Sequence, residues 1–103
     1  MARARDNKVE PLAGLCFAEV VIPNKKGLHA RASAQFVRCA SGFTAAVRVT
    51  REGHTVGGTS IMGLMMLSAA PGTAITVEAT GNEAAEVMEA LTALIASRFG
   101  EDD

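Results

Sequence analysis

Between a predicted strand and a predicted helix the chain reads NKKGLHARASAQF, residues 24–36. The preceding segment, FAEVVIP (17–23), is rich in β-branched residues, alternates its apolar positions and ends at a proline, as strands often do. Residues 29–41 carry apolar side chains at helical spacing and precede Gly42, a typical residue at a helix end. The stretch therefore predicts a loop that turns into a helix at His29. The expected inward positions of this helix are Ala30, Ala34, Val37 and Ala40, with Phe36 beside them.

The rest of the chain predicts three more strands and two more helices. The strands are FTAAVRVT (43–50), HTVGGT (54–59) and AITVEAT (74–80), and SIMGLMML (60–67) is a short helix. The last helix is expected from Glu83 to Phe99, with Asn82 as its N-cap and an apolar stripe along one side. Alternating strands have one polar face, which favours an antiparallel sheet covered by helices on the other face. The predicted fold is a two-layer α+β domain of order βαββαβα.

The composition is that of one small domain with an aliphatic core. The chain has 103 residues and no Trp or Tyr. We expect residues 1–15 to form a flexible N-terminal extension, 16–100 the domain and 101–103 an acidic tail. A net charge of −1 lacks the basic excess of a nucleic-acid binder. No apolar run has the length of a membrane span, and two cysteines make no disulfide framework, so a cytoplasmic protein without membrane insertion is expected.

The surroundings of His29 favour an anion beside its ring. At a helix start the amides of Ala30, Arg31 and Ala32 lack intrahelical partners, and the helix dipole is positive there. Gly27 allows a sharp turn, and a guanidinium can hold two oxygens at once. A neutral imidazole beside such donors is a good phosphoryl acceptor, because phosphoryl transfer needs mainly positioning and charge compensation. A histidine at a helix start does not by itself indicate a phosphoryl acceptor. The combination of His29 with Gly27 and Arg31 favours that function.

Two segments resemble a known family. GLHARASAQFV (27–37) is similar to the active-site segment of HPr, the histidine-containing phosphocarrier of the bacterial phosphoenolpyruvate-dependent phosphotransferase system. GGTSIMGLMMLSAAPGTAITVEATG (57–81) is similar to a second hallmark of that family, a serine before a short apolar helix and a closing strand. The resemblance extends from Phe17 to about Arg98. It implies an open-faced β-sandwich, with four antiparallel strands and three helices on one face, and it leans toward the nitrogen-related branch of the system.

The resemblance also implies roles for particular residues. His29 resembles the histidine that the family phosphorylates on Nδ1, and Arg31 resembles the arginine that neutralises the phosphoryl group. Ser60 resembles the regulatory serine that an HPr kinase/phosphorylase modifies in some bacteria. Many members have proline directly after the arginine, where this chain has Ala32, so the start of the helix is expected to be less preorganised.

The short helix at 60–67 has two interpretations. Ser60 suits its N-cap, a role that is compatible with phosphorylation. Ile61, Met62 and Met65 are either core residues or an exposed apolar patch on which several partners dock.

We therefore predict a monomeric phosphoryl carrier that is not itself an enzyme and needs no cofactor or metal. It would receive its phosphoryl group from phosphoenolpyruvate through enzyme I, on His29, and pass it to an enzyme IIA-type protein. Neither the histidines nor the cysteines have metal-ligand spacing. The alternative is a ferredoxin-like, small-molecule-sensing regulatory module, because the same element order fits that class. Such a module would not need His29.

Overall fold

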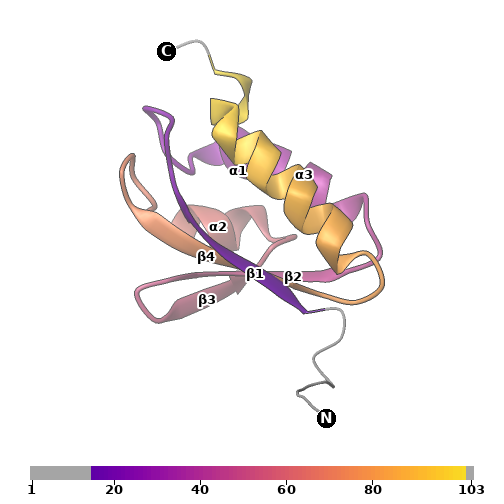
Figure 1. Cartoon of the computed structure of the whole chain (residues 1–103). Coiled ribbons are helices and arrows are strands. Elements are labelled where there is room, and N and C mark those ends of the chain that lie inside the picture. Colours follow the sequence, from indigo (N-terminus) through magenta and orange to yellow (C-terminus); the bar gives the residue numbers. More distant parts are fainter. Residues whose placement is uncertain (1–14, 102–103) are drawn as a thin grey trace.

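The computed structural model describes residues 15–101 and confirms the predicted order of strands and helices (Figure 1). Most of the predicted N-terminal extension (1–14) and two residues of the predicted acidic tail (102–103) lie outside the described residues. The elements in chain order are β1 (Cys16–Val21), α1 (Ala30–Ser41), β2 (Ala46–Arg51), β3 (His54–Gly57), α2 (Ile61–Met66), β4 (Ala74–Thr80), α3 (Ala84–Ala96) and the 3-10 turn η1 (Arg98–Gly100).

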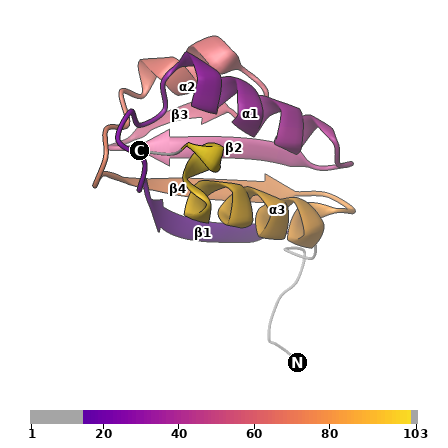
Figure 2. The ribbon, with the colours of Figure 1, turned by 90° about the horizontal axis from the view of Figure 1, so that it is seen from above.

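The four strands form one antiparallel sheet in the order β1-β4-β2-β3. The last strand in the sequence, β4, thus lies between β1 and β2, and Val77 faces Ala18 on one side and Val49 on the other. The helices pack on one face of this sheet, as Figures 1 and 2 show. The opposite face is open and carries Phe17 and Val21 at exposed positions of β1. The predicted open-faced β-sandwich is therefore confirmed.

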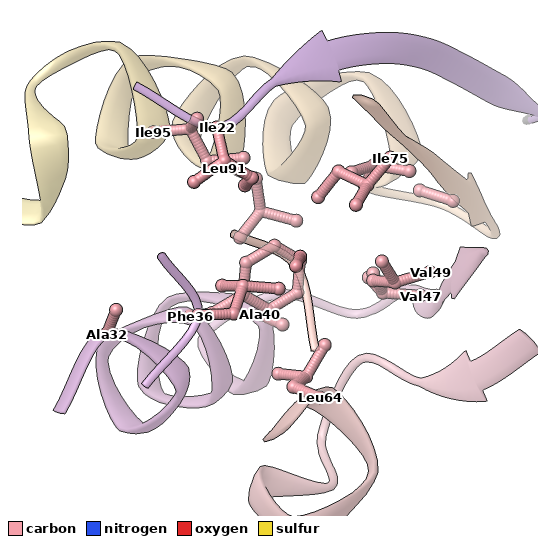
Figure 3. Close-up of a cluster of buried hydrophobic side chains, with 14 of the residues drawn as sticks. Ile22, Ala32, Phe36, Ala40, Val47, Val49, Leu64, Ile75, Leu91 and Ile95 are labelled. Atoms are coloured by element: carbon pink, nitrogen blue, oxygen red, sulfur yellow. The ribbon is translucent and has the colours of Figure 1, made fainter. Parts of the chain in front are cut away.

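The core lies between the sheet and the helices, with Phe36 of α1 fully buried near its centre. Figure 3 shows side chains of α1, α2 and α3 gathered in this layer over Ile75, Val47 and Val49 of the sheet. The predicted inward face of α1 was wrong in part. The buried residues are Ala32, Ser33, Phe36 and Ala40, whereas Ala30 is exposed and Ala34 and Val37 are half-buried. Pointing the large Phe36 ring inward fixes the rotation of the helix, because burying that ring stabilises more than burying any alanine.

Helix α3 carries the predicted apolar stripe but has different ends. Its buried residues are Ala84, Val87, Met88, Leu91 and Ile95. The prediction of Asn82 as N-cap was wrong, because Glu83 occupies that position. The Glu83 carboxylate instead accepts a hydrogen bond of 2.6 Å from the amide of Thr44, in the loop before β2. The helix also ends at Ala96 rather than at Phe99.

A 3-10 turn follows α3 and redirects the chain. Arg98 (φ 61°) and Phe99 (φ 57°) both have left-handed backbone conformations, which cost roughly 1–2 kcal/mol for each non-glycine residue. The Phe99 ring is almost fully buried, and burial of such a side chain stabilises by about 1.5–3 kcal/mol. Burial of the aromatic ring therefore offsets much of the cost of the two left-handed residues, and the turn brings Glu101 back to the start of α1.

Candidate functional site

His29 lies where the loop after β1 becomes α1. It is the N-cap residue, with an extended backbone (φ −75°, ψ −178°), and its carbonyl accepts the hydrogen bond of 2.8 Å from Ser33 that opens the helix. Its ring also caps the helix, because Nδ1 accepts a hydrogen bond of 3.3 Å from the amide of Arg31. About a quarter of the side chain (26%) is exposed. The ring is therefore held at the helix start and is accessible from solvent.

The loop in front of His29 is fixed by backbone contacts to the segment after α2. Gly27 adopts a left-handed conformation (φ 63°), and a Cβ at this position would lie 2.3 Å from the carbonyl oxygen of Ala69. The next amide, that of Leu28, donates to the same oxygen at 3.0 Å. Ser33 is buried in the first turn of α1 and its hydroxyl donates to the Leu28 carbonyl at 3.1 Å. Only glycine allows this close approach, which explains the glycine two residues before the histidine.

The second ring nitrogen of His29 has a partner that the sequence did not predict. Nε2 lies 2.6 Å from Oε2 of Glu101, whose side chain is only 11% exposed. Oε1 of the same carboxylate accepts a hydrogen bond of 3.2 Å from Nδ2 of Asn24, which is fully buried in the loop and also donates to the Gly27 carbonyl at 2.9 Å. Glu101 was assigned to the acidic tail, because no pattern in the sequence indicates a turn at 98–100. Asn24 was read only as a polar loop residue.

The predicted anion-binding residues lie together at the first turn of α1. The amide of Arg31 points at the imidazole, as the capping bond requires. The side chains of Ala30 and Arg31 are exposed, whereas Ala32 is fully buried against the core. The Ala32 side chain thus fills space in the helix–sheet layer, at the position where many relatives were expected to have proline.

A shallow pocket of about 220 Å³ lies beside the histidine and is lined by Lys26, Leu28, His29, Ser68, Ala69 and Ala70. Because Lys26 and His29 both line this pocket, it has a positive charge beside the imidazole. A larger pocket of about 480 Å³ lies between the β2–β3 turn and the end of α2 and contains none of the predicted site residues. His54 lines that pocket and is exposed.

Ser60 is the N-cap of α2, and its hydroxyl accepts a hydrogen bond of 2.9 Å from the amide of Gly63. In α2 itself, Leu64 is fully buried, while Ile61, Met62 and Met65 are exposed, with Met62 at 72%. Met66, which was not among the predicted docking residues, is exposed as well. Helices α1 and α2 pack against each other, so this apolar patch belongs to the same layer as the histidine helix (Figure 2).

Residues 15–101 offer neither a metal centre nor a membrane-spanning helix. No cluster of three or more histidine, cysteine or acidic residues in that range could hold a metal ion. Cys16 and Cys39 are both free thiols, and burial raises the pKa of the Cys39 thiol. No helix within the described range is long and apolar enough to cross a membrane.

Similarity to known proteins extends along most of the described range. The family described as "PTS HPr component phosphorylation site" matches residues 17–97. The chain belongs to the HPr family. The phosphocarrier protein HPr of Neisseria meningitidis serogroup A is 54% identical over 84 residues, which are 82% of this chain and 94% of the relative. That of Cupriavidus necator is 48% identical over 85 residues, 82% of this chain and 96% of the relative.

A solved structure supports the same assignment. The crystal structure of HPr-C-His from Thermoanaerobacter tengcongensis has a TM-score of 0.82 to this chain at 39% identity, covering 85% of this chain and 99% of that one. Relatives of the HPr family are named phosphocarrier proteins. The chain is therefore a phosphocarrier of the phosphotransferase system and not itself an enzyme.

Proposed function

We propose that His29 is the phosphoryl-accepting residue of this carrier. In the cytoplasm, enzyme I transfers a phosphoryl group from phosphoenolpyruvate to Nδ1 of His29, and the phosphorylated carrier passes the group to an enzyme IIA-type protein. The observation that carries the proposal is the orientation of the ring. Nδ1 faces the amide of Arg31 at the start of α1, while Nε2 faces the Glu101 carboxylate.

The helix start offers an anion site once the phosphoryl group is on Nδ1. The Arg31 amide that now donates to the nitrogen would donate to a phosphoryl oxygen instead, and the positive end of the helix dipole favours the added charge. The Arg31 side chain is exposed two residues after His29 and would supply a permanent cation with a fork of donors if it turns toward the phosphoryl group. The alternative of a small-molecule-sensing module is left without support, since the HPr family covers nearly all of the domain.

Labelling with phosphoenolpyruvate and enzyme I tests the acceptor. The chain has two histidines, so His54→Ala is a matched control for His29→Ala: both remove one imidazole, and His54 is exposed on β3. We expect acid-labile label on the wild type and on His54→Ala, and none on His29→Ala. Undiminished acid-labile label on His29→Ala would refute the assignment.

Arg31 is tested by the same reaction. Hydrogen bonds to charged groups contribute about 1.5–3 kcal/mol, so Arg31→Ala should slow phosphoryl uptake roughly 10- to 100-fold. Arg31→Lys keeps the charge but loses the two-pronged geometry of the guanidinium. Its rate of phosphoryl uptake should therefore lie between those of the wild type and Arg31→Ala. Equal rates for all three proteins would show that the guanidinium does not reach the phosphoryl group.

We also propose that phosphorylation of Ser60 by an HPr kinase/phosphorylase regulates docking. Ser60 is exposed at the N-cap of α2 and borders the apolar patch of Ile61, Met62 and Met65. Asn and Asp both cap helices well and differ mainly in charge, so Ser60→Asp and Ser60→Asn form a matched pair. We expect only Ser60→Asp to slow phosphorylation of His29 by enzyme I, with a smaller effect at high salt. Equal rates for the pair at low salt would exclude Ser60 from the docking surface.

The docking patch itself is tested by removing an exposed apolar side chain. Met62→Ser should raise the apparent KM for enzyme I or the IIA-type protein, because truncating a contributing interface residue typically costs about 1 kcal/mol or more. Phe17→Ser is the matched control, since Phe17 is equally exposed (70%) but lies on the open face of the sheet. If both substitutions change the apparent KM equally, the patch on α2 is not the docking site.

A further inference from the structure

Both nitrogens of the His29 ring have partners, and the two partners demand the same tautomer. The Arg31 amide can only donate, so Nδ1 must offer its lone pair. An ionised carboxylate can only accept, so Nε2 must carry the proton that is shared with Oε2 of Glu101 at 2.6 Å. Each contact therefore supports the other, and together they leave Nδ1 as the nucleophilic nitrogen.

The Glu101 carboxylate is itself held in place. Its second oxygen accepts from Nδ2 of the fully buried Asn24, and the same amide group donates to the Gly27 carbonyl. The Asn24 Oδ1 atom is buried without a protein partner, which costs stability. Burial of Asn24 thus costs stability, while its two amide protons connect Glu101 to the loop before His29.

We propose that Glu101 is a positioning residue for phosphoryl transfer: it fixes the ring with Nδ1 toward the phosphoryl donor and stabilises the charge that the ring gains. The inference rests on the proposed role of His29. When the Nδ1–P bond forms, the bond from phosphorus to the donor atom breaks and the electron pair leaves with the donor. The ring then carries phosphorus on Nδ1 and a proton on Nε2 and is a cation, which the carboxylate on Nε2 faces directly.

The negative charge of Glu101 also repels an incoming phosphoryl group, but this effect is the smaller one. The carboxylate contacts the ring nitrogen at 2.6 Å, whereas the phosphoryl group joins the nitrogen on the other side of the ring. Coulomb energy falls with distance, and water and Arg31 screen the longer interaction. The net effect of the carboxylate therefore favours the phosphorylated ring. In serine proteases a carboxylate on the second nitrogen of the catalytic imidazole likewise orients the ring and stabilises its positive charge.

The test uses Glu101→Gln, with Glu89→Gln as a matched control. Both changes remove one negative charge, and Glu89 is exposed on α3. The first measurement is the rate of phosphorylation by phosphoramidate, a small donor whose P–N bond breaks with release of ammonia, so that no docking surface is involved. Loss of a hydrogen bond to a charged group corresponds to roughly 10- to 100-fold in rate, and we expect a slowing of that order for Glu101→Gln and none for Glu89→Gln. A rate for Glu101→Gln within about twofold of the wild type would overturn the proposal.

The second measurement separates positioning from a merely structural role. ¹⁵N chemical shifts of the neutral His29 ring report which nitrogen carries the proton. We expect the Nε2–H tautomer in the wild type and in Glu101→Gln, whose amide oxygen still accepts, and a mixture in Glu101→Ala. Predominance of the Nδ1–H tautomer in the wild type would overturn the proposal. Failure of enzyme I to label His29 while phosphoramidate labels it would instead count against the proposed function alone.

Discussion

Replacing Gly27 with alanine should be among the most damaging single substitutions in the loop before His29. An alanine in the left-handed conformation that Gly27 adopts (φ 63°) costs about 1–2 kcal/mol. The new Cβ would also lie 2.3 Å from the Ala69 carbonyl oxygen, a backbone atom that cannot rotate away. The two segments must therefore separate, which breaks the hydrogen bond from Leu28 to that oxygen and leaves buried groups unpaired at about 1–3 kcal/mol.

The expected loss is about 2–5 kcal/mol of the free energy of unfolding. For a domain of this size, 1 kcal/mol corresponds to roughly 4–8 °C in Tm, so Gly27→Ala should melt at least about 8 °C below the wild type. Urea denaturation followed by circular dichroism measures the same loss. Folded Gly27→Ala should also accept the phosphoryl group more slowly. A shift of this loop would also move Asn24, which donates to Glu101 beside the His29 ring.

Gly53→Ala separates strain from steric clash. Gly53 also has a positive φ (83°), but a Cβ there would have no neighbour within 4 Å. Its cost should therefore be the backbone term of about 1–2 kcal/mol alone. If Gly27→Ala is no more destabilising than Gly53→Ala, the close approach of the loop to Ala69 is not what requires glycine.

Three further substitutions and modifications follow from packing, capping and ionisation. Phe36→Ala should lower the free energy of unfolding by about 3–5 kcal/mol in urea denaturation, since Phe36 is fully buried; a loss below that of Met62→Ala on the exposed face of α2 would contradict this account of the core. Ser60→Ala should cost about 0.5–2 kcal/mol through loss of the cap to Gly63, and Ser60→Asn should restore most of it; no recovery would mean that the cap is not the cause. Burial raises the pKa of the Cys39 thiol, so the group stays protonated to higher pH and its iodoacetamide alkylation at pH 8 should be slower in the folded protein than in urea; equal rates would contradict this.

Local patterns in the sequence were sufficient to predict the fold and to single out His29 as the candidate site residue. The alternation in β1, β2 and β4 and the stripe in α3 are periodic signals, and each was strong enough to place its element. His29 was predicted as the phosphoryl acceptor because glycine, histidine, arginine and a helix start occur within a few residues. The inward face of α1 was misplaced because its small alanines give nearly the same signal on several sides, while Phe36 alone decides which side is buried.

The rest of the site depends on contacts between distant residues, which no local pattern encodes. The early end of α3 follows from burial of Phe99 in a left-handed turn, an outcome that propensity alone does not favour. Glu83, the expected first residue of the last helix, is its N-cap instead, and its carboxylate bonds the amide of Thr44, 39 positions earlier. Glu101 and Asn24 meet in the same way, across 77 positions.

The contact between His29 and Glu101 joins residues 72 positions apart, which has a consequence for how reactivity arises during folding. A peptide of residues 24–41 contains the imidazole and all of α1, yet it holds no carboxylate against Nε2. Closing so long a loop costs entropy that only the assembled core repays. Full reactivity of the imidazole should thus appear with global folding rather than with the first helix, so phosphoramidate reactivity during refolding would report the completion of the tertiary structure.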